Sequence, residues 1–127
     1  EAVVDEPFPL EIAAPQQWQR QLTHIIDRRS RIYEHLLPIY LSPIFQRQRA
    51  NQEPKDSLHL AAARRRKRLN QVLPAELRNN KPLFEAIDAT LGIEFWMSLR
   101  HSQQLSAKKT RQVVTTALDR LIADPSK

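Results

Sequence analysis

Residues 83–100 have no broad polar face, and this segment restricts the fold more than any other part of the sequence. On a helical wheel, one stripe carries five large apolar side chains: Phe84, Ile87, Leu91, Phe95 and Leu99. The opposite side is also apolar and carries Ala86, Ala89, Ile93, Trp96 and Met97. A helix that is apolar all round has to be buried all round, so it needs a central position or a second chain against it.

Glycine and proline usage predicts an all-α fold. The chain of 127 residues has one glycine, Gly92, and most of its nine prolines lie between or at the ends of segments with helical apolar periodicity. The sequence contains no convincing strand pattern. A chain of this length fits one domain. We therefore expect an orthogonal and antiparallel bundle of about five helices.

The N-terminal half predicts an arm followed by an interrupted helix. Residues 1–14 lack periodicity and contain two prolines, so we expect an extended arm or linker before one helical domain at 15–127. A first amphipathic helix should begin at the start of that domain. Pro38 should kink or break it, because proline lacks the backbone donor and clashes with the preceding turn. A second break is expected near Pro43, and the polar tract QRQRANQEPKD after it resembles a loop.

The C-terminal half predicts three more helices. One at about 55–73 ends at the proline of a short PAEL turn. Asn80 is the expected N-cap of a long helix that reaches about residue 102. Ser106 is the expected N-cap of a last helix that ends at Ala123.

These last two helices carry more apolar surface than one neighbour needs, which favours a self-complementary interface between two copies of the chain. Gly92 should then mark a close approach of two helices. The expected interface residues are Ala86, Ala89, Gly92, Ile93, Trp96, Met97, Val113, Val114, Ala117, Leu118 and Leu121. The alternative is that both helices form the core of a single protomer.

The sequence pattern resembles a known family at this point. Ile87-Asp88-Ala89 through Glu94-Phe95-Trp96, then Leu99-Arg100, Leu105-Ser106 and Ala117-Leu118 look like the C-terminal regulatory domain of tetracycline-repressor (TetR) family transcription regulators. The upstream segments RIYEHLLPIY, AAARRRKRLNQVL and PAEL occur in a similar order. The resemblance covers about residues 15–123 and is more specific in 83–123. It departs at Gln104, where the family commonly has glycine before Leu-Ser.

The resemblance implies a dimeric sensor domain. In that family the last two helices pair with their twins in a four-helix bundle, and the preceding helices enclose a cavity for a small-molecule effector. An N-terminal helix-turn-helix domain binds operator DNA, and residues 1–14 cannot supply one. The expected partners are therefore a second copy and an effector, with DNA reached only through the missing domain.

Two arginines interrupt apolar stripes and are candidate effector contacts. Arg29 lies within the stripe of the first helix and Arg65 within that of the third, and a guanidinium there could meet an anionic group of an effector. The alternative is snorkelling, or a salt bridge to an acid among Glu34, Asp56, Glu85 and Asp88. Aromatic candidates for the cavity wall, which ordinary core packing explains equally well, are Tyr33, Tyr40 and Phe45.

Other function classes have weak support. The sequence contains no phosphate loop, nucleophile elbow or paired-carboxylate signature, so we expect no enzyme and no cofactor. We expect no metal site, because His24 and His35 lie about 16 Å apart along a helix. Without cysteine, a signal peptide or a membrane span, the chain is expected to be cytoplasmic and not membrane-bound.

Two rival interpretations remain open. The chain carries 20 Lys and Arg against 14 Asp and Glu, and the first eleven residues hold four acids and no base. The basic run RRRKR could indicate a nucleic-acid binder, but its charges point around most of the helix and form no single stripe. The other rival is a stand-alone helical interaction module whose apolar helices recruit a different protein.

Overall fold

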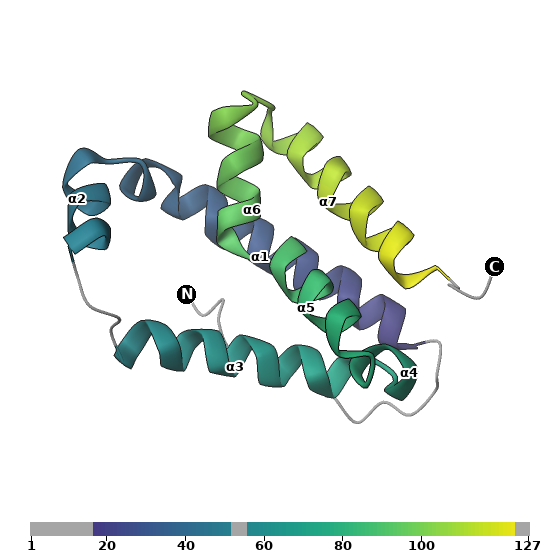
Figure 1. The fold of residues 1–127 in the computed structure, drawn as a ribbon. Helices are drawn as coiled ribbons and strands as arrows, with labels where there is room; N and C mark the ends of the chain where they lie inside the picture. Colours follow the sequence, from purple (N-terminus) through teal and green to yellow (C-terminus); the bar gives the residue numbers. More distant parts are fainter. Residues whose placement is uncertain (1–16, 52–55, 124–127) are drawn as a thin grey trace.

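The computed structural model describes residues 17–51 and 56–123, and this part of the chain consists of helices joined by short turns (Figure 1). The expected all-α fold is confirmed. The elements are α1 (Gln17–Tyr40), α2 (Pro43–Asn51), α3 (Asp56–Val72), α4 (Ala75–Arg78), α5 (Lys81–Thr90), α6 (Ile93–Met97), a π-helical turn η2 (Ser98–Ser102) and α7 (Ala107–Ile122). The expected arm at 1–14 lies outside the described residues.

α1 lies against most of the other helices. It contacts α2, α3, α6 and α7, and α7 folds back along α5 after a tight turn (Figure 1). The core forms where these helices meet, around side chains that are almost fully enclosed: Leu69, Leu73, Ile87 and Leu118. An ion pair adds a surface link, because Asp27 on α1 accepts from Arg111 on α7 at 2.7 Å.

Several predicted boundaries are wrong in detail. The break expected at Pro38 comes two residues later, because α1 continues to Tyr40 with the proline inside its last turn. A proline so near the C-terminal end removes one donor without dividing the helix. The tract expected as a loop is partly helical, since α2 runs to Asn51. The PAEL turn forms the single-turn helix α4, so the described part has more helices than the five expected.

The long helix expected from the Asn80 cap to about residue 102 is interrupted after Leu91. Gly92 is the N-cap of α6, with extended backbone angles of −85° and 166°, and does not lie in a helix interior. A Cβ added there would meet the carbonyl oxygen of Ala89 at 3.4 Å. The expectation that this glycine lies inside a long helix is therefore wrong, while its expected close approach to a helix of a second copy stays a prediction. It lies at a joint, and α5 and α6 turn different faces to the core.

The two predicted N-caps are confirmed. Asn80 accepts a hydrogen bond from the backbone N–H of Leu83 at 3.2 Å, and Ser106 accepts from that of Lys109 at 3.1 Å. Each side chain satisfies one of the donors that a helix N-terminus leaves free. The last helix ends at the predicted position, with Ala123 as its C-cap.

Gln104 has a φ of 59°, the left-handed region that glycine adopts without strain. Because a residue with a Cβ pays about 1–2 kcal/mol there, Gln104→Gly should raise the free energy of unfolding by about 0.5–1 kcal/mol in urea denaturation. The matched control is Gln103→Gly at a right-handed neighbour with φ of −98°, which should lower it by about 0.5–1 kcal/mol. Equal effects of the two substitutions would contradict this explanation.

Thr110 on α7 is fully buried, and its hydroxyl has no hydrogen-bond partner in the described part of the chain. The isosteric Thr110→Val should therefore raise the free energy of unfolding by about 1 kcal/mol, since it removes an unsatisfied buried group. Thr90 is the control, because its hydroxyl donates to the carbonyl oxygen of Ala86 at 2.8 Å. Thr90→Val should be neutral or cost up to about 1 kcal/mol, and a destabilised Thr110→Val would refute the argument.

Candidate functional site

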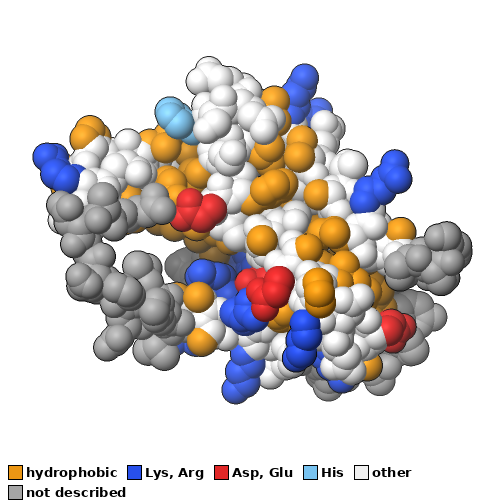
Figure 2. Space-filling view, viewed as in Figure 1, with side chains coloured by type: hydrophobic (Ala, Val, Ile, Leu, Met, Phe, Trp, Pro, Cys, Tyr) orange, Lys and Arg blue, Asp and Glu red, His pale blue; other side chains and the backbone are white. Residues whose placement is uncertain are grey.

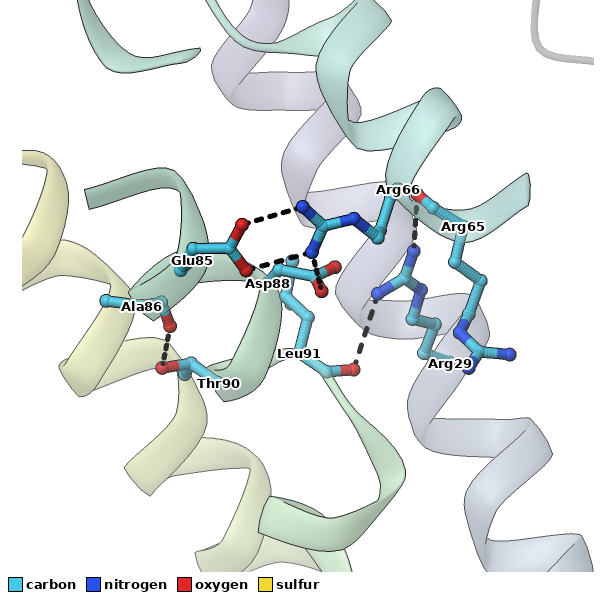
Figure 3. Close-up of polar contacts among 8 residues, drawn as sticks. All are labelled: Arg29, Arg65, Arg66, Glu85, Ala86, Asp88, Thr90 and Leu91. Atoms are coloured by element: carbon cyan, nitrogen blue, oxygen red, sulfur yellow. Dashed lines mark hydrogen bonds and ion pairs between the residues drawn. The ribbon is translucent and has the colours of Figure 1, made fainter. Parts of the chain in front are cut away.

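Two side chains of α1 converge on the joint between α5 and α6. The carbonyl oxygen of Leu91 has no helical partner because the helix stops there, and it accepts a hydrogen bond from the Tyr33 hydroxyl at 2.8 Å. A guanidinium nitrogen of Arg29 lies 3.4 Å from the same oxygen. The other terminal nitrogen of Arg29 lies 3.4 Å from the carbonyl oxygen of Arg65 on α3 (Figure 3). The candidate site is therefore where α1, α3 and the joint meet.

Arg29 is a buried cation without an ion-pair partner among the described residues. Its side chain is 8% exposed, and both of its contacts are longer than the about 2.7–3.2 Å usual for an N–H···O bond. The acids expected to pair with it are engaged elsewhere: Glu34 by Arg100, and Glu85 and Asp88 by Arg66. The side chain of the fourth, Asp56, lies outside the described ones. Burial lowers the pKa of the Arg29 guanidinium, because an enclosed charge loses its contacts with water.

Of the other predicted effector contacts, Tyr33 shares the Leu91 carbonyl oxygen with Arg29, while Arg65, Tyr40 and Phe45 do not place their side chains beside it. Arg65 contributes its carbonyl oxygen, while its own side chain is exposed and extends away from that contact (Figure 3). Tyr40 and Phe45 lie at the corner between α1 and α2, where their rings are 5.6 Å apart and the Tyr40 hydroxyl donates to Glu94. Tyr33 and Tyr40 are two helical turns apart on α1, about 10 Å along its axis.

A second polar cluster, which the sequence analysis did not find, joins α1 to the segment after the joint. Glu34 accepts from Arg100 Nε at 2.8 Å and Nη2 at 3.0 Å, and from the indole N–H of Trp96 at 2.8 Å. The hydrogen bond from Arg100 is the main cause that lowers the pKa of the Glu34 carboxyl. No sequence signal marks this cluster, because Glu34 lies more than sixty residues before both of its partners.

A basic groove lies between α3 and the α4–α5 region. Its volume is about 420 Å³, and it is lined by Ala63, Arg66, Lys67, Asn70, Arg78, Lys81, Phe84 and Glu85. Arg66 is fixed on one side: it forms a bidentate pair with Glu85 at 2.7 and 2.9 Å and a third contact with Asp88 at 3.1 Å (Figure 3). Its guanidinium also lies 5.1 Å from the ring centre of Phe84.

The predicted dimer residues fall into two groups. The core of the single chain already encloses Trp96, Met97, Val114 and Leu118, each no more than 4% exposed. These four cannot add much area to an interface unless the chain rearranges. The remaining predicted residues are half-buried or exposed: Ala86, Ala89, Gly92, Ile93, Val113, Ala117 and Leu121. They lie on α5, α6 and α7 and at the joint.

The described residues hold neither a metal cluster nor a membrane-spanning helix. They contain no group of three or more metal-ligating side chains. None of their helices has the length and apolar character needed to cross a bilayer. Comparison of the chain with protein-family models, with curated proteins and with solved structures gave no match. The family resemblance therefore stays a prediction from the sequence.

The Glu34 cluster predicts a pH dependence of stability. The folded-state pKa of Glu34 is below its ordinary value of 4.5, so its stabilising effect is fully present above pH 4.5 and is lost as the pH falls through the folded pKa. Glu34→Gln should lower the free energy of unfolding at neutral pH by about 1–2 kcal/mol, measured in urea. The difference from the unmodified chain should shrink below pH 4.5, and a pH-independent difference would contradict the assignment.

Proposed function

We propose that this chain is the regulatory domain of a tetracycline-repressor-like transcription regulator, which forms homodimers through α5 and α7 and binds a small-molecule effector. The effector shifts the balance between two helix arrangements, and the change reaches a DNA-binding domain outside this sequence. The observation that carries the proposal is Arg29, a buried guanidinium at a helix joint that no described carboxylate neutralises.

Arg29 supports an effector with an anionic group. A carboxylate could accept two short hydrogen bonds from the guanidinium fork, in place of its two long contacts with carbonyl oxygens. Both of these oxygens belong to other helices than α1, namely those of Leu91 and Arg65. An anion at this place would therefore loosen the contacts of α1 with both the joint and α3.

The face formed by α5, α6 and α7 supports the homodimer. Hydrophobic side chains gather on this face in the space-filling view (Figure 2). The small side chains of Ala86 and Ala89 on α5 lie half-buried or exposed, as do Val113, Ala117 and Leu121 on α7. Small residues allow a second pair of helices to come close, and apolar area at the contact would provide the driving force.

Native mass spectrometry of the purified chain tests both parts of the proposal in one measurement. We expect a dimer at micromolar concentration, with additional mass where an effector from the expression host is retained. A monomer at that concentration would overturn the proposed dimer face. A polydisperse species that a different protein converts into a defined complex would overturn the homodimer in favour of an interaction module.

Arg29→Met tests the effector contact. Because methionine fills similar space without a buried charge, the variant should keep the dimer and unfold at equal or higher urea concentration. It should lose retained anionic ligand, and in ligand titrations its affinity should fall about 10-fold or more. Arg31→Met is the control on the same helix, since Arg31 is exposed and forms an ion pair with Asp27 at the surface. Normal ligand binding by Arg29→Met would overturn the assigned role.

One observation favours a second candidate function, the stand-alone interaction module. Ile39 and Ile44 are large hydrophobic side chains that remain 56% and 64% exposed at the corner between α1 and α2. They lie apart from the proposed dimer residues in the sequence and on different helices. An Ile39→Ser and Ile44→Ser double variant that lost a partner protein but kept the homodimer would support this function.

A further inference from the structure

We propose that the basic groove between α3 and the α4–α5 region binds the acidic N-terminal arm, residues 1–14, of the same chain. This inference is independent of effector binding and of dimerisation. It rests on the charges that the groove leaves unneutralised, on the charge of the arm and on the covalent link between them.

The groove has a neutralised side and a basic side. On the first side Arg66 is saturated by Glu85 and Asp88, so this arginine and these acids hold each other. On the other side Lys67 and Lys81 are exposed, and within the described ranges no short ion pair holds either ammonium, although the charge of Lys81 helps to lower the pKa of Glu85. Arg78 is held in place by one donor, which bonds the carbonyl oxygen of Leu73 at 2.8 Å. The basic side can therefore accept carboxylates without breaking an existing pair.

The arm has the complementary chemistry. The first eleven residues carry four carboxylates and no base, whereas residues 12–127 carry 20 bases and 10 acids. The arm alternates its acids with apolar residues such as Val4, Phe8 and Leu10. The groove likewise combines cations with the apolar Ala63 and the ring of Phe84. An extended segment can thus place carboxylates near the lysines and apolar side chains between them.

The spacing of the charges favours the arm over duplex DNA. Duplex DNA carries a negative charge about every 1.7 Å along its axis, and such a density would bring phosphates against Glu85 at the groove. The acids of the arm are separated: Glu1 stands four residues before the Asp5–Glu6 pair, and Glu11 five residues after it. A chain with such gaps can pass the carboxylate of Glu85 without a direct repulsive contact.

The covalent link makes a weak interaction sufficient. Glu11 lies six residues before Gln17, the first residue of α1, and Glu6 lies eleven before it. At about 3.3 Å per extended residue the arm reaches about 20 Å from α1 at Glu11 and about 36 Å at Glu6, more than the length of α3. The start of α1 and α4 lie at the same end of the view in Figure 1. Such a tether gives a high effective concentration of carboxylates at the groove.

Zero-length carbodiimide cross-linking of the full chain tests the contact, because it joins a carboxylate to an amine only when the two touch. We expect peptides that link Lys67 or Lys81 to Asp5, Glu6 or Glu11 within one chain. Lys108 and Lys109 on α7 are the controls, being equally exposed lysines outside the groove. The yield at the groove should exceed that of the controls about fivefold and fall to their level at about 1 M salt, where charge interactions are screened.

Charge exchange provides the second measurement. The effect of the arm is the difference in NMR chemical shift of the groove's backbone amides between the unmodified chain and a Glu6→Lys, Glu11→Lys variant. The double substitution Lys67→Glu, Lys81→Glu should abolish this difference. Both groove lysines are exposed, so their replacement should leave the helices intact. Combining the two pairs of reversals should restore arm-dependent shifts.

Several results would overturn the proposal. Equal cross-linking at the groove and at Lys108 or Lys109 would show that the arm has no preferred place. Links found only between two chains, identified with mixed isotope labels, would show that the groove binds another copy and not its own arm. Unchanged chemical shifts of the groove amides in the Glu6→Lys, Glu11→Lys variant would likewise show that the arm does not bind the groove.

Discussion

The carbonyl oxygen of Leu91 is the point on which the arrangement of the helices depends. It is left free where α5 ends, and an unsatisfied buried carbonyl costs about 1–3 kcal/mol, so the interruption requires a donor from elsewhere. Tyr33 supplies that donor from α1. The following turn is tied to the same helix through Glu34. α1 therefore fixes the place and the direction of the segment that leads into α7.

Local signals in the sequence predicted the two N-caps well and the interruption after Leu91 poorly. Asn80 and Ser106 are caps that act within three residues of their own position, so their types and spacing suffice. The joint at Gly92 depends on a hydroxyl 58 residues earlier in the chain. Periodicity alone reads 83–100 as one helix, because both sides of the joint are apolar. The apolar periodicity predicts that all sides of this segment are buried. The chain meets that requirement partly by changing direction between α5 and α6.

The candidate site was predictable only in part for a similar reason. Arg29 was recognisable as a charge on an apolar stripe, but that no described carboxylate pairs with it depends in part on the engagement of Glu34 with Arg100, 66 residues away. The basic groove combines residues of α3 with residues of the α4–α5 region, and no spacing within one helix marks it. The acidic residues of the first eleven positions are visible in the sequence. The basic groove is visible only in the folded chain, where these helices come together.

The π-helical turn at Ser98–Ser102 has a consequence for how the chain tolerates changes in length. Its bond from Gln103 N–H to the Ser98 carbonyl spans five residues, one more than an α-helical bond, at 3.1 Å. A homologous chain one residue shorter here can close the same turn as α-helix and leave the Trp96–Glu34 hydrogen bond, which lies upstream of the turn, in place. One residue removed within α5 would instead rotate every later side chain by about 100° and separate them from α1. Natural insertions and deletions should thus collect at this turn and be rare in α5.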